Sequence, residues 1–395
     1  MRFYIRNLAV VGLLVVPVYA APKKVALKSA SGGVLVFQRD GKLEAIRDGQ
    51  KKPVVLRDAF LSHRLFGDFD ASWNFSPSGD KVAFASTPSD VEFFSAAAYR
   101  QYLWVAPFNE EQKVLLAAYG KYATKDSYSF DSPSWSFNGK RLAVSQVASH
   151  DDPEEVAVYD ANTRKEIWSS RTESPKLFPH DFGNTPATRN VWRDIFSPSL
   201  SPDGNDLVCF TIGMEGGGYH GRLPDKAPPI TVVHFDLKHH TGEVIASLAD
   251  DLSLTDHQKL RTQCVWHPTQ KRVLFVGPAS AAGRPLGLFS FDLKTKILKR
   301  LTNNKEDNFS PQWSLDGKQI WWIRGNGFSV FQDGANSASP SANLNRIFRS
   351  NADGSNPTPI LPQLRGVTRI QLLPKIADWS RYRKLSIEPL AGKDK

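Results

Sequence analysis

The stretches Pro133-Ser-Trp-Ser-Phe-Asn-Gly-Lys140 and Pro311-Gln-Trp-Ser-Leu-Asp-Gly-Lys318 share one pattern: a large aromatic residue, a tight turn and the start of a second apolar run. Asn-Gly and Asp-Gly are strong signals of a short turn between antiparallel strands, because Gly adopts positive φ without a steric cost. Apolar residues alternate after the turn, as in a strand that buries one face. Each stretch therefore predicts a β-hairpin.

The hairpin pattern recurs along most of the chain. Further copies begin at Phe75, Leu200 and Trp266, and a degraded copy begins at Trp379. The copies at Trp266 and Trp379 lack the Gly, so their turns are expected to differ. A second pair of strands follows each of the five clear hairpins, the first of them ending in a strand over 113–116. Two hairpins form the four-stranded antiparallel sheet of one propeller blade.

The N-terminal stretches 33–37, 42–46 and 53–56 predict three strands without an opening Trp-type strand. The copy at Trp379 is expected to supply the missing strand, so that both chain ends share the last blade and no edge strand is left open. We therefore expect an all-β fold, a six-bladed β-propeller. A seven-bladed propeller is the alternative, if each chain end forms its own blade.

The first twenty residues are typical of a secretory signal peptide. Arg2 and Arg6 precede the apolar run 8–16, and small residues at positions 18 and 20 predict cleavage after Ala20. The run is short for a hydrocarbon core of about 30 Å, which disfavours the alternative of an uncleaved anchor. We expect residues 21–395 to form a single propeller domain in the periplasm or outside the cell, with no membrane span.

The composition narrows the choice of partners. Lys and Arg number 50 against 40 Asp and Glu, a formal net charge of +10, which favours an anionic partner. The basic residues are scattered rather than clustered, so no nucleic-acid partner is predicted. Cys209 and Cys264 both lie in apolar stretches, which favours two separate buried thiols over a disulfide between neighbouring blades.

The pattern Pro-x-Trp-Ser-x-Asp-Gly-Lys resembles the repeat of TolB-type, WD40-like propellers, as do the stretches 347–356 and 301–304. The resemblance extends over most of the chain and implies the propeller fold. It leaves the function open, because such propellers serve as protein-binding platforms and as enzyme domains. No counterpart of the α/β domain that precedes the TolB propeller is found, which argues against a direct role in the Tol-Pal system. The Gly-x-Ser-x-Gly elbow of hydrolases joined to propellers is also missing from the sequence.

The expected ring has two different sides. Inner strands run from one side, here called the upper side, to the hairpin turns on the lower side. Connections between second and third strands lie on the upper side and are long, and long surface connections usually carry binding. The candidate binding residues line an upper-side funnel: Asp68, Asp70, Tyr128, Asp131, His180, Arg193, Asp194, His220, Arg261, Gln263, Asp307, Asn308 and Arg369. The alternative is that polar side chains here satisfy backbone groups at strand ends.

The sequence predicts an exported, non-enzymatic propeller that binds a protein or an acidic glycan of the cell envelope, without a cofactor. The alternative is a polysaccharide-active enzyme, a lyase or hydrolase, that uses His180 and His220 in the same funnel; a purely structural domain is a third possibility. The histidines lack the close spacing of zinc ligands, so no metal site is predicted. Nothing marks a Ser as a nucleophile, so no catalytic residue is predicted.

Overall fold

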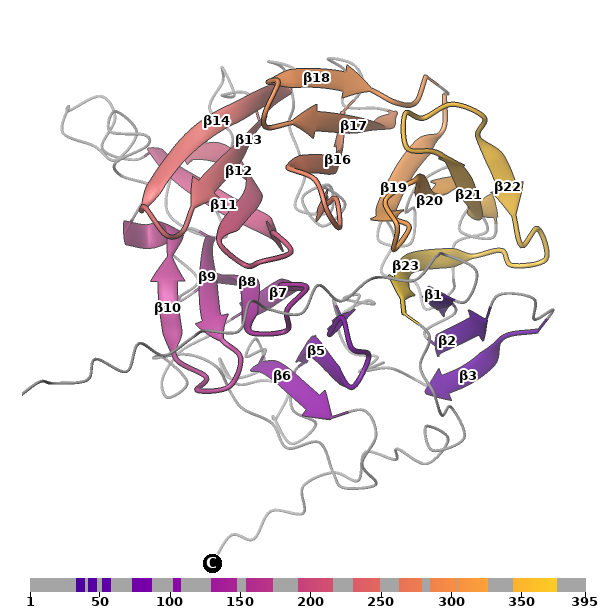
Figure 1. Ribbon diagram of the computed structural model, residues 1–395, viewed down its shortest axis with the longest axis horizontal. Coiled ribbons are helices and arrows are strands. Elements are labelled where there is room, and N and C mark those ends of the chain that lie inside the picture. The colour runs from indigo at the N-terminus through magenta and orange to yellow at the C-terminus, as the bar shows by residue number, and fades with distance from the viewer. Residues whose placement is uncertain are drawn as a thin grey trace, which may run out of the picture.

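The structure, a computed structural model, describes residues 33–39, 42–47, 52–57, 73–86, 102–107, 129–147, 154–172, 191–215, 230–248, 263–278, 285–303, 305–325 and 344–374. These residues form five four-stranded sheets and one three-stranded sheet, arranged around a central axis (Figure 1). This all-β arrangement is a β-propeller, as the repeated hairpins predict.

In four of the four-stranded blades the strands follow chain order from the axis outward. The first has β7 (Ser129–Trp135), β8 (Arg141–Val147), β9 (Glu155–Asp160) and β10 (Glu166–Ser169). The second has β11 (Val191–Leu200), β12 (Asp206–Glu215), β13 (Ile230–Asp236) and β14 (Thr241–Leu248). The third has β15 (Cys264–Trp266), β16 (Arg272–Pro278), β17 (Leu286–Asp292) and β18 (Ile297–Arg300). The fourth has β19 (Asp307–Trp313), β20 (Gln319–Gly325), β21 (Arg346–Asn351) and β22 (Thr358–Ile360).

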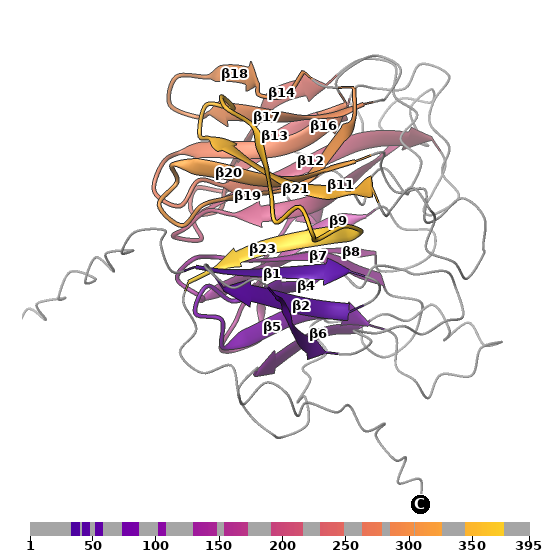
Figure 2. The same ribbon diagram turned by 90° about the vertical axis from the view of Figure 1, so that its right-hand side faces the viewer.

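Both ends of the described chain share the fifth blade. Its strands, from inside outward, are β23 (Val367–Leu373), β1 (Val34–Arg39), β2 (Lys42–Arg47) and β3 (Val54–Arg57). β23 pairs antiparallel with β1, and Val34 is the register partner of Leu373. Figure 2 shows the two strands side by side. The prediction of a blade closed by both chain ends is confirmed.

The position of the closing strand was predicted wrongly. It ends at Leu373 rather than at Trp379, which lies outside the described residues. The observed register places β23 between two neighbours: Ile370 N donates to Ser310 Oγ at 2.9 Å, and the Gln371 side chain bonds both backbone groups of Phe75. The Trp-Ser pair at 379 matches the repeat, but these contacts select the stretch Val367–Leu373 that precedes it.

Five four-stranded blades are complete within the described residues, so neither the expected six blades nor the alternative seven are confirmed. The remaining sheet consists of β4 (Trp73–Phe75), β5 (Lys81–Ser86) and β6 (Tyr102–Pro107). Its expected fourth strand over 113–116 lies outside the described residues, so the count of six blades stays a prediction.

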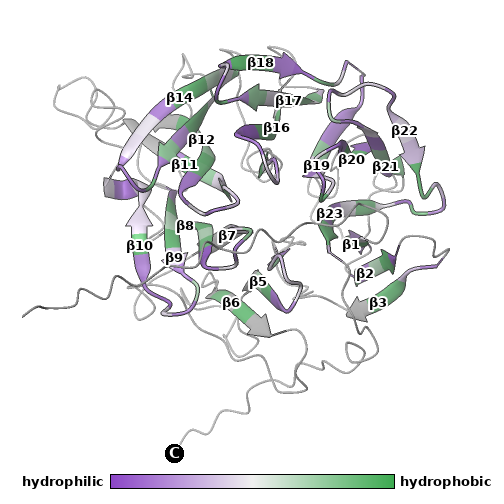
Figure 3. Cartoon of the chain, in the orientation of Figure 1, coloured by the Kyte–Doolittle hydropathy of each residue, from purple (hydrophilic) through white to green (hydrophobic). Residues whose placement is uncertain are grey.

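Apolar clusters fill the space between neighbouring blades. One cluster joins Phe210 and Val232 of the β11–β14 blade to Trp266, Val273 and Phe275 of the β15–β18 blade. Apolar residues recur along the strands, while the turns are mostly hydrophilic (Figure 3). The predicted alternation after each turn is the source of this packing, since Val273 and Phe275 point into one cluster. Burying one such side chain contributes roughly 1.5–3 kcal/mol.

Indole groups link the inner strands around the ring. A Trp at the end of one inner strand donates to a backbone carbonyl of the inner strand before it. The bonds are Trp135 Nε1 to Asn74 O at 3.1 Å, Trp266 Nε1 to Ser199 O at 2.7 Å and Trp313 Nε1 to Val265 O at 3.3 Å. The repeated Trp therefore both fills the seam between blades and pairs a carbonyl that β-pairing leaves free.

A Ser-Pro pair gives β7, β11 and β19 the same bulge. Ser132, Ser197 and Ser310 have φ of 49°, 51° and 50°, at the points where the strand registers shift. Such a conformation costs a residue other than Gly about 1–3 kcal/mol and must be held by its surroundings. Ser197 N donates to Ser145 Oγ at 3.0 Å, and Ser310 Oγ accepts from Ile370, so these bulges lie against neighbouring blades.

Cys209 and Cys264 are separate buried thiols, as favoured from the sequence. Burial raises the pKa of both, so neither is a reactive thiolate near neutral pH. In the portion of the chain that the structure describes, no helix is long and apolar enough to cross a membrane.

Candidate functional site

The structure places only some of the predicted funnel residues. Asp131 and Arg193 lie in β7 and β11, but their side chains fall outside what the structure describes. Six other candidates lie outside the described residues: Asp68, Asp70, Tyr128, His180, His220 and Arg261. The remaining five, Asp194, Gln263, Asp307, Asn308 and Arg369, lie in or next to inner strands.

Asp307 and Asn308 begin β19 on the upper side, and both contact Leu286 of the preceding blade. Asp307 Oδ1 accepts from Leu286 N at 2.9 Å, and Asn308 Nδ2 donates to Leu286 O at 2.9 Å. Asn308 Oδ1 also accepts from Trp322 Nε1 at 3.0 Å. Both residues are buried. Their polar groups thus hold the start of β17 against β19.

Asp194 has the same role at an earlier seam between blades. It lies six residues before Leu200, as Asp307 lies six residues before Trp313. Asp194 Oδ1 accepts from Glu154 N at 3.0 Å, next to the first residue of β9. An inner-strand carboxylate therefore caps the third strand of the preceding blade at two positions, which matches the alternative of satisfied strand ends.

Gln263 and Arg369 are half-buried near the same side. Gln263 O accepts from Val276 N at 3.0 Å, which extends the pairing of β15 with β16. The Arg369 guanidinium lies 5.5 Å from the centre of the Trp73 ring and has further contacts. A binding role for the thirteen candidates stays a prediction.

The lower side is built from turns whose polar groups bond one another. In the turn at 314–318, Ser314 Oγ donates to Asp316 Oδ1 at 2.7 Å, and Lys318 N donates to the same oxygen at 3.0 Å. Although burial opposes it, these bonds hold the pKa of Asp316 below its usual value. Asp203 forms the same contacts with Ser201 and Asn205.

His267 replaces this Ser-Asp pair in the copy that lacks Gly. Its Nδ1 accepts from Thr269 N at 3.2 Å and Gln270 N at 3.1 Å, and its Nε2 donates to Gly317 O of the next blade at 3.1 Å. The ring lies 4.7 Å from that of Trp313. Burial lowers the pKa of His267, which keeps the neutral form that these contacts require. The expectation of a different turn in this copy is confirmed.

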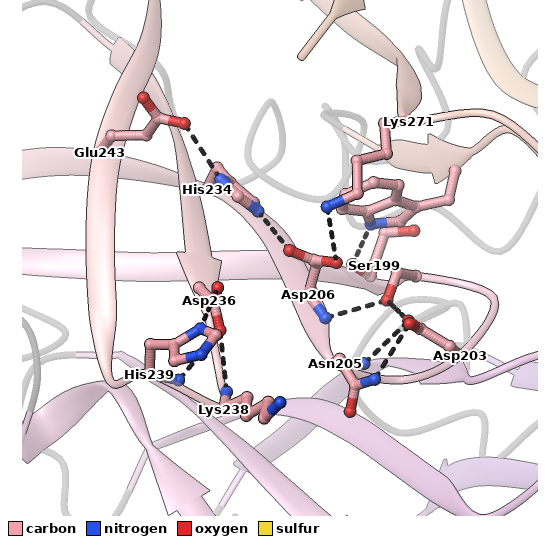
Figure 4. Close-up of polar contacts among 12 residues, drawn as sticks. Ser199, Asp203, Asn205, Asp206, His234, Asp236, Lys238, His239, Glu243 and Lys271 are labelled. Carbon is pink, nitrogen blue, oxygen red and sulfur yellow. Dashed lines mark hydrogen bonds and ion pairs between the residues drawn. The ribbon is translucent and has the colours of Figure 1, made fainter. Parts of the chain in front are cut away.

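A chain of ionisable residues, here called the seam charge chain, joins two blades on the lower side, and Figure 4 shows it from Glu243 to Lys271. It runs from Lys271 to Asp206 (3.9 Å), His234 (2.8 Å), Glu243 (3.2 Å) and Lys296 (2.7 Å). Carboxylates only accept hydrogen bonds, so both contacts of His234 are satisfied together when both ring nitrogens carry a proton. None of these residues was predicted from the sequence, where the available signal is the polar residue His234 in the otherwise apolar run Val232–Phe235.

The outer ion pair of the seam charge chain, between Lys296 and Glu243, crosses from one blade to the next but contributes little to stability. The bond from Lys296 holds the pKa of Glu243 below its usual value, yet both side chains are about half exposed. Such a pair contributes about 0–1 kcal/mol. Within the described residues, no group of three or more His, Cys, Asp or Glu residues could hold a metal ion.

No protein-family model and no curated protein sequence matches the chain. Its fold is similar to TolB from Acinetobacter baumannii, with 14% identity, a TM-score of 0.48 and coverage of 87% of this chain and 67% of that one. A puromycin-hydrolyzing peptidase from Mycobacterium tuberculosis has 17% identity and a TM-score of 0.46, with 86% of this chain and 45% of that one covered. An oligogalacturonate lyase in complex with manganese has 12% identity and a TM-score of 0.42, over 84% and 74%. These structural neighbours are TolB-like propeller proteins, but their TM-scores are all below 0.5, so the propeller fold of this chain rests on its own sheets.

Proposed function

We propose that the chain is an exported, non-enzymatic binding propeller of six blades, with a signal peptide over residues 1–20 and one domain over 21–395. Its upper side engages a protein or an acidic glycan of the cell envelope, in the periplasm or outside the cell. The net charge of +10 favours the anionic partner.

The proposal rests on a difference between the two sides of the ring: the lower side has short turns, and the upper side joins strands that are far apart in the sequence. On the lower side, strands are joined by short turns, such as 136–140 and 314–318, whose polar groups bond within the turn. On the upper side, β12 and β20 end and β13 and β21 begin, and the stretches of sequence between them, 216–229 and 326–345, are long. A side chain that already bonds its own turn is a weak partner for a ligand, so recognition is assigned to the upper side.

Crosslinking in native envelope followed by affinity capture tests the proposal. Shortening the connection 216–229 is expected to abolish capture of the partner. The double variant Lys140→Ala and Lys318→Ala, which changes two exposed residues of the lower turns, is the control and is expected to retain it. Capture that survives the shortened connection and is lost in the control would contradict the proposal. Turnover of acidic polysaccharides by the purified protein would contradict the non-enzymatic role.

A further inference from the structure

Two arginines face each other at the upper end of the β19–β22 blade. Arg324, near the end of β20, is the register partner of Arg346, the first residue of β21. Residues directly opposite in an antiparallel pair point to the same face, with Cβ atoms about 4.5–5.5 Å apart. Like charges in this position destabilise a sheet unless a counter-charge lies between them.

The Arg324 side chain is held in place by aromatic rings. Its guanidinium carbon lies 3.9 Å from the centre of the Phe348 ring and 5.8 Å from that of Trp322. Trp322 is fixed in turn by its bond to Asn308. A stacked guanidinium loses little further freedom when it binds, and its planar fork fits a carboxylate through two parallel hydrogen bonds.

The described residues leave the two arginines without a bonded acid. Arg324 Nε is buried and has no hydrogen-bond partner among them. Glu306 is the described acidic residue whose charge acts on Arg324. Arg346 is exposed, and the same portion of the chain offers it no side-chain hydrogen bond or ion pair. A buried donor without a partner costs free energy that a ligand oxyanion would recover.

We infer that Arg324 and Arg346 form a binding site for the carboxylate groups of an acidic glycan. The inference rests on the proposed function and locates its ligand on the upper side, at the seam between the β15–β18 and β19–β22 blades. Among the described residues of the β19–β22 blade, Leu344 is the large apolar residue that is exposed, whereas Lys305, Glu306 and Arg346 are exposed charged residues. Protein partners are usually anchored by an apolar interface core, so this setting favours a glycan, whose surface is hydroxyl and carboxylate.

Calorimetric titration with glucuronate oligomers tests the inference, with neutral glucose oligomers of equal length as the comparison ligand. Arg324→Met keeps a side chain that packs on Phe348 and removes the charge. Arg346→Gln removes the second charge. Each is expected to weaken glucuronate binding about tenfold or more, the loss of one charge-assisted contact. Arg324→Lys is expected to give an intermediate loss, because it keeps the charge and loses the fork.

Arg349→Gln is the matched control. Arg349 lies in the same strand, is the register partner of Trp321 and stacks 5.8 Å from that ring, so the variant makes the same charge change on the opposite face. It is expected to bind within about twofold of the unmodified protein, a change of under half a kcal/mol. Thermal unfolding of each variant shows whether it folds. If Arg324→Met does not fold, Arg324→Lys takes its place in the binding test.

Three outcomes would overturn the inference: no binding of glucuronate oligomers, equal losses in Arg349→Gln, or stronger binding of a glutamate-rich peptide than of the glycan. Affinity capture from native envelope reports separately on the proposed function. If the partner is still captured through the upper side and glucuronate is not bound, the site fails and the proposed function stands. If glucuronate is bound and no partner is captured, the site stands and the proposed function fails.

Discussion

Protonation of His267 offers a direct test of how the lower-side turns are held. Burial lowers the pKa of this imidazole, Arg272 lowers it further, and only the bond to Gly317 and the charge of Asp316 oppose the shift. A proton on Nδ1 would also face the two backbone N–H groups of Thr269 and Gln270, which now donate to that atom. The variant His267→Asn removes the titrating group and keeps a small acceptor near the position of Nδ1.

The sign and the size of the effect follow from linkage. The folded-state pKa of His267 lies below its unfolded value of about 6.5, so the unfolded chain binds more protons as the pH falls below that value. The stabilisation is therefore fully present above about pH 6.5 and is lost as the pH falls towards the folded-state pKa. One proton sets an upper limit of about 1.4 kcal/mol per pH unit, so the loss between pH 6.5 and 5.5 is at most about 1.4 kcal/mol.

Denaturant unfolding of both proteins at pH 7.5 and 5.5 measures the effect. Groups common to both proteins affect both equally, so the informative quantity is the difference between the two proteins in the free energy of unfolding. That difference is expected to move in favour of His267→Asn as the pH falls. If this difference stays constant, or moves in favour of the unmodified protein, the turn is not held by a buried neutral imidazole at His267.

Two further predictions concern the seams between blades. Trp266→Phe leaves the buried carbonyl of Ser199 without its 2.7 Å partner and is expected to cost at least about 1–3 kcal/mol in urea unfolding; an unchanged midpoint would contradict a role for the indole bond. Gly317→Ala and Gly139→Ala both place a side chain at positive φ (71° and 68°), but the new Cβ would lie 2.3 Å from the His267 ring only at Gly317. Gly139→Ala is expected to lower the free energy of unfolding by about 1–3 kcal/mol through backbone strain, and Gly317→Ala by clearly more. The extra loss in Gly317→Ala should become smaller when His267 is also changed to Asn. Equal losses in the two Gly variants would refute the clash with His267.

The fold could be predicted from the sequence because its cause is local and repeated. Each hairpin pairs a large apolar residue with a tight turn, and the structure keeps the five clear copies in register as β4–β5, β7–β8, β11–β12, β15–β16 and β19–β20. The closing strand was misplaced because its evidence is not local. Leu373 carries no turn motif, and what selects its strand is contact with Ser310 and Phe75, far away in the chain.

The candidate site could be predicted only incompletely. Asp307 and Asn308 were expected to face a ligand because they lead into an inner strand, but their bonds to Leu286 depend on how closely two blades approach. The pair of Arg324 and Arg346 was not predicted from the sequence, for a related reason. Arg346 lies 22 positions after Arg324 in the sequence, and only the pairing of β20 with β21 brings them face to face.

The pairing of β1 with β23 has a consequence for how the chain assembles. Its register partners come from opposite ends of the domain, so the ring closes only after almost all of the chain is available. Until then β1 presents an unpaired edge, the kind of surface that accepts a strand from another molecule. A second copy of the chain offers the same stretch 367–373 with the same register. Slow closure at high concentration would therefore favour exchange of the terminal strand between copies, giving dimers by domain swapping.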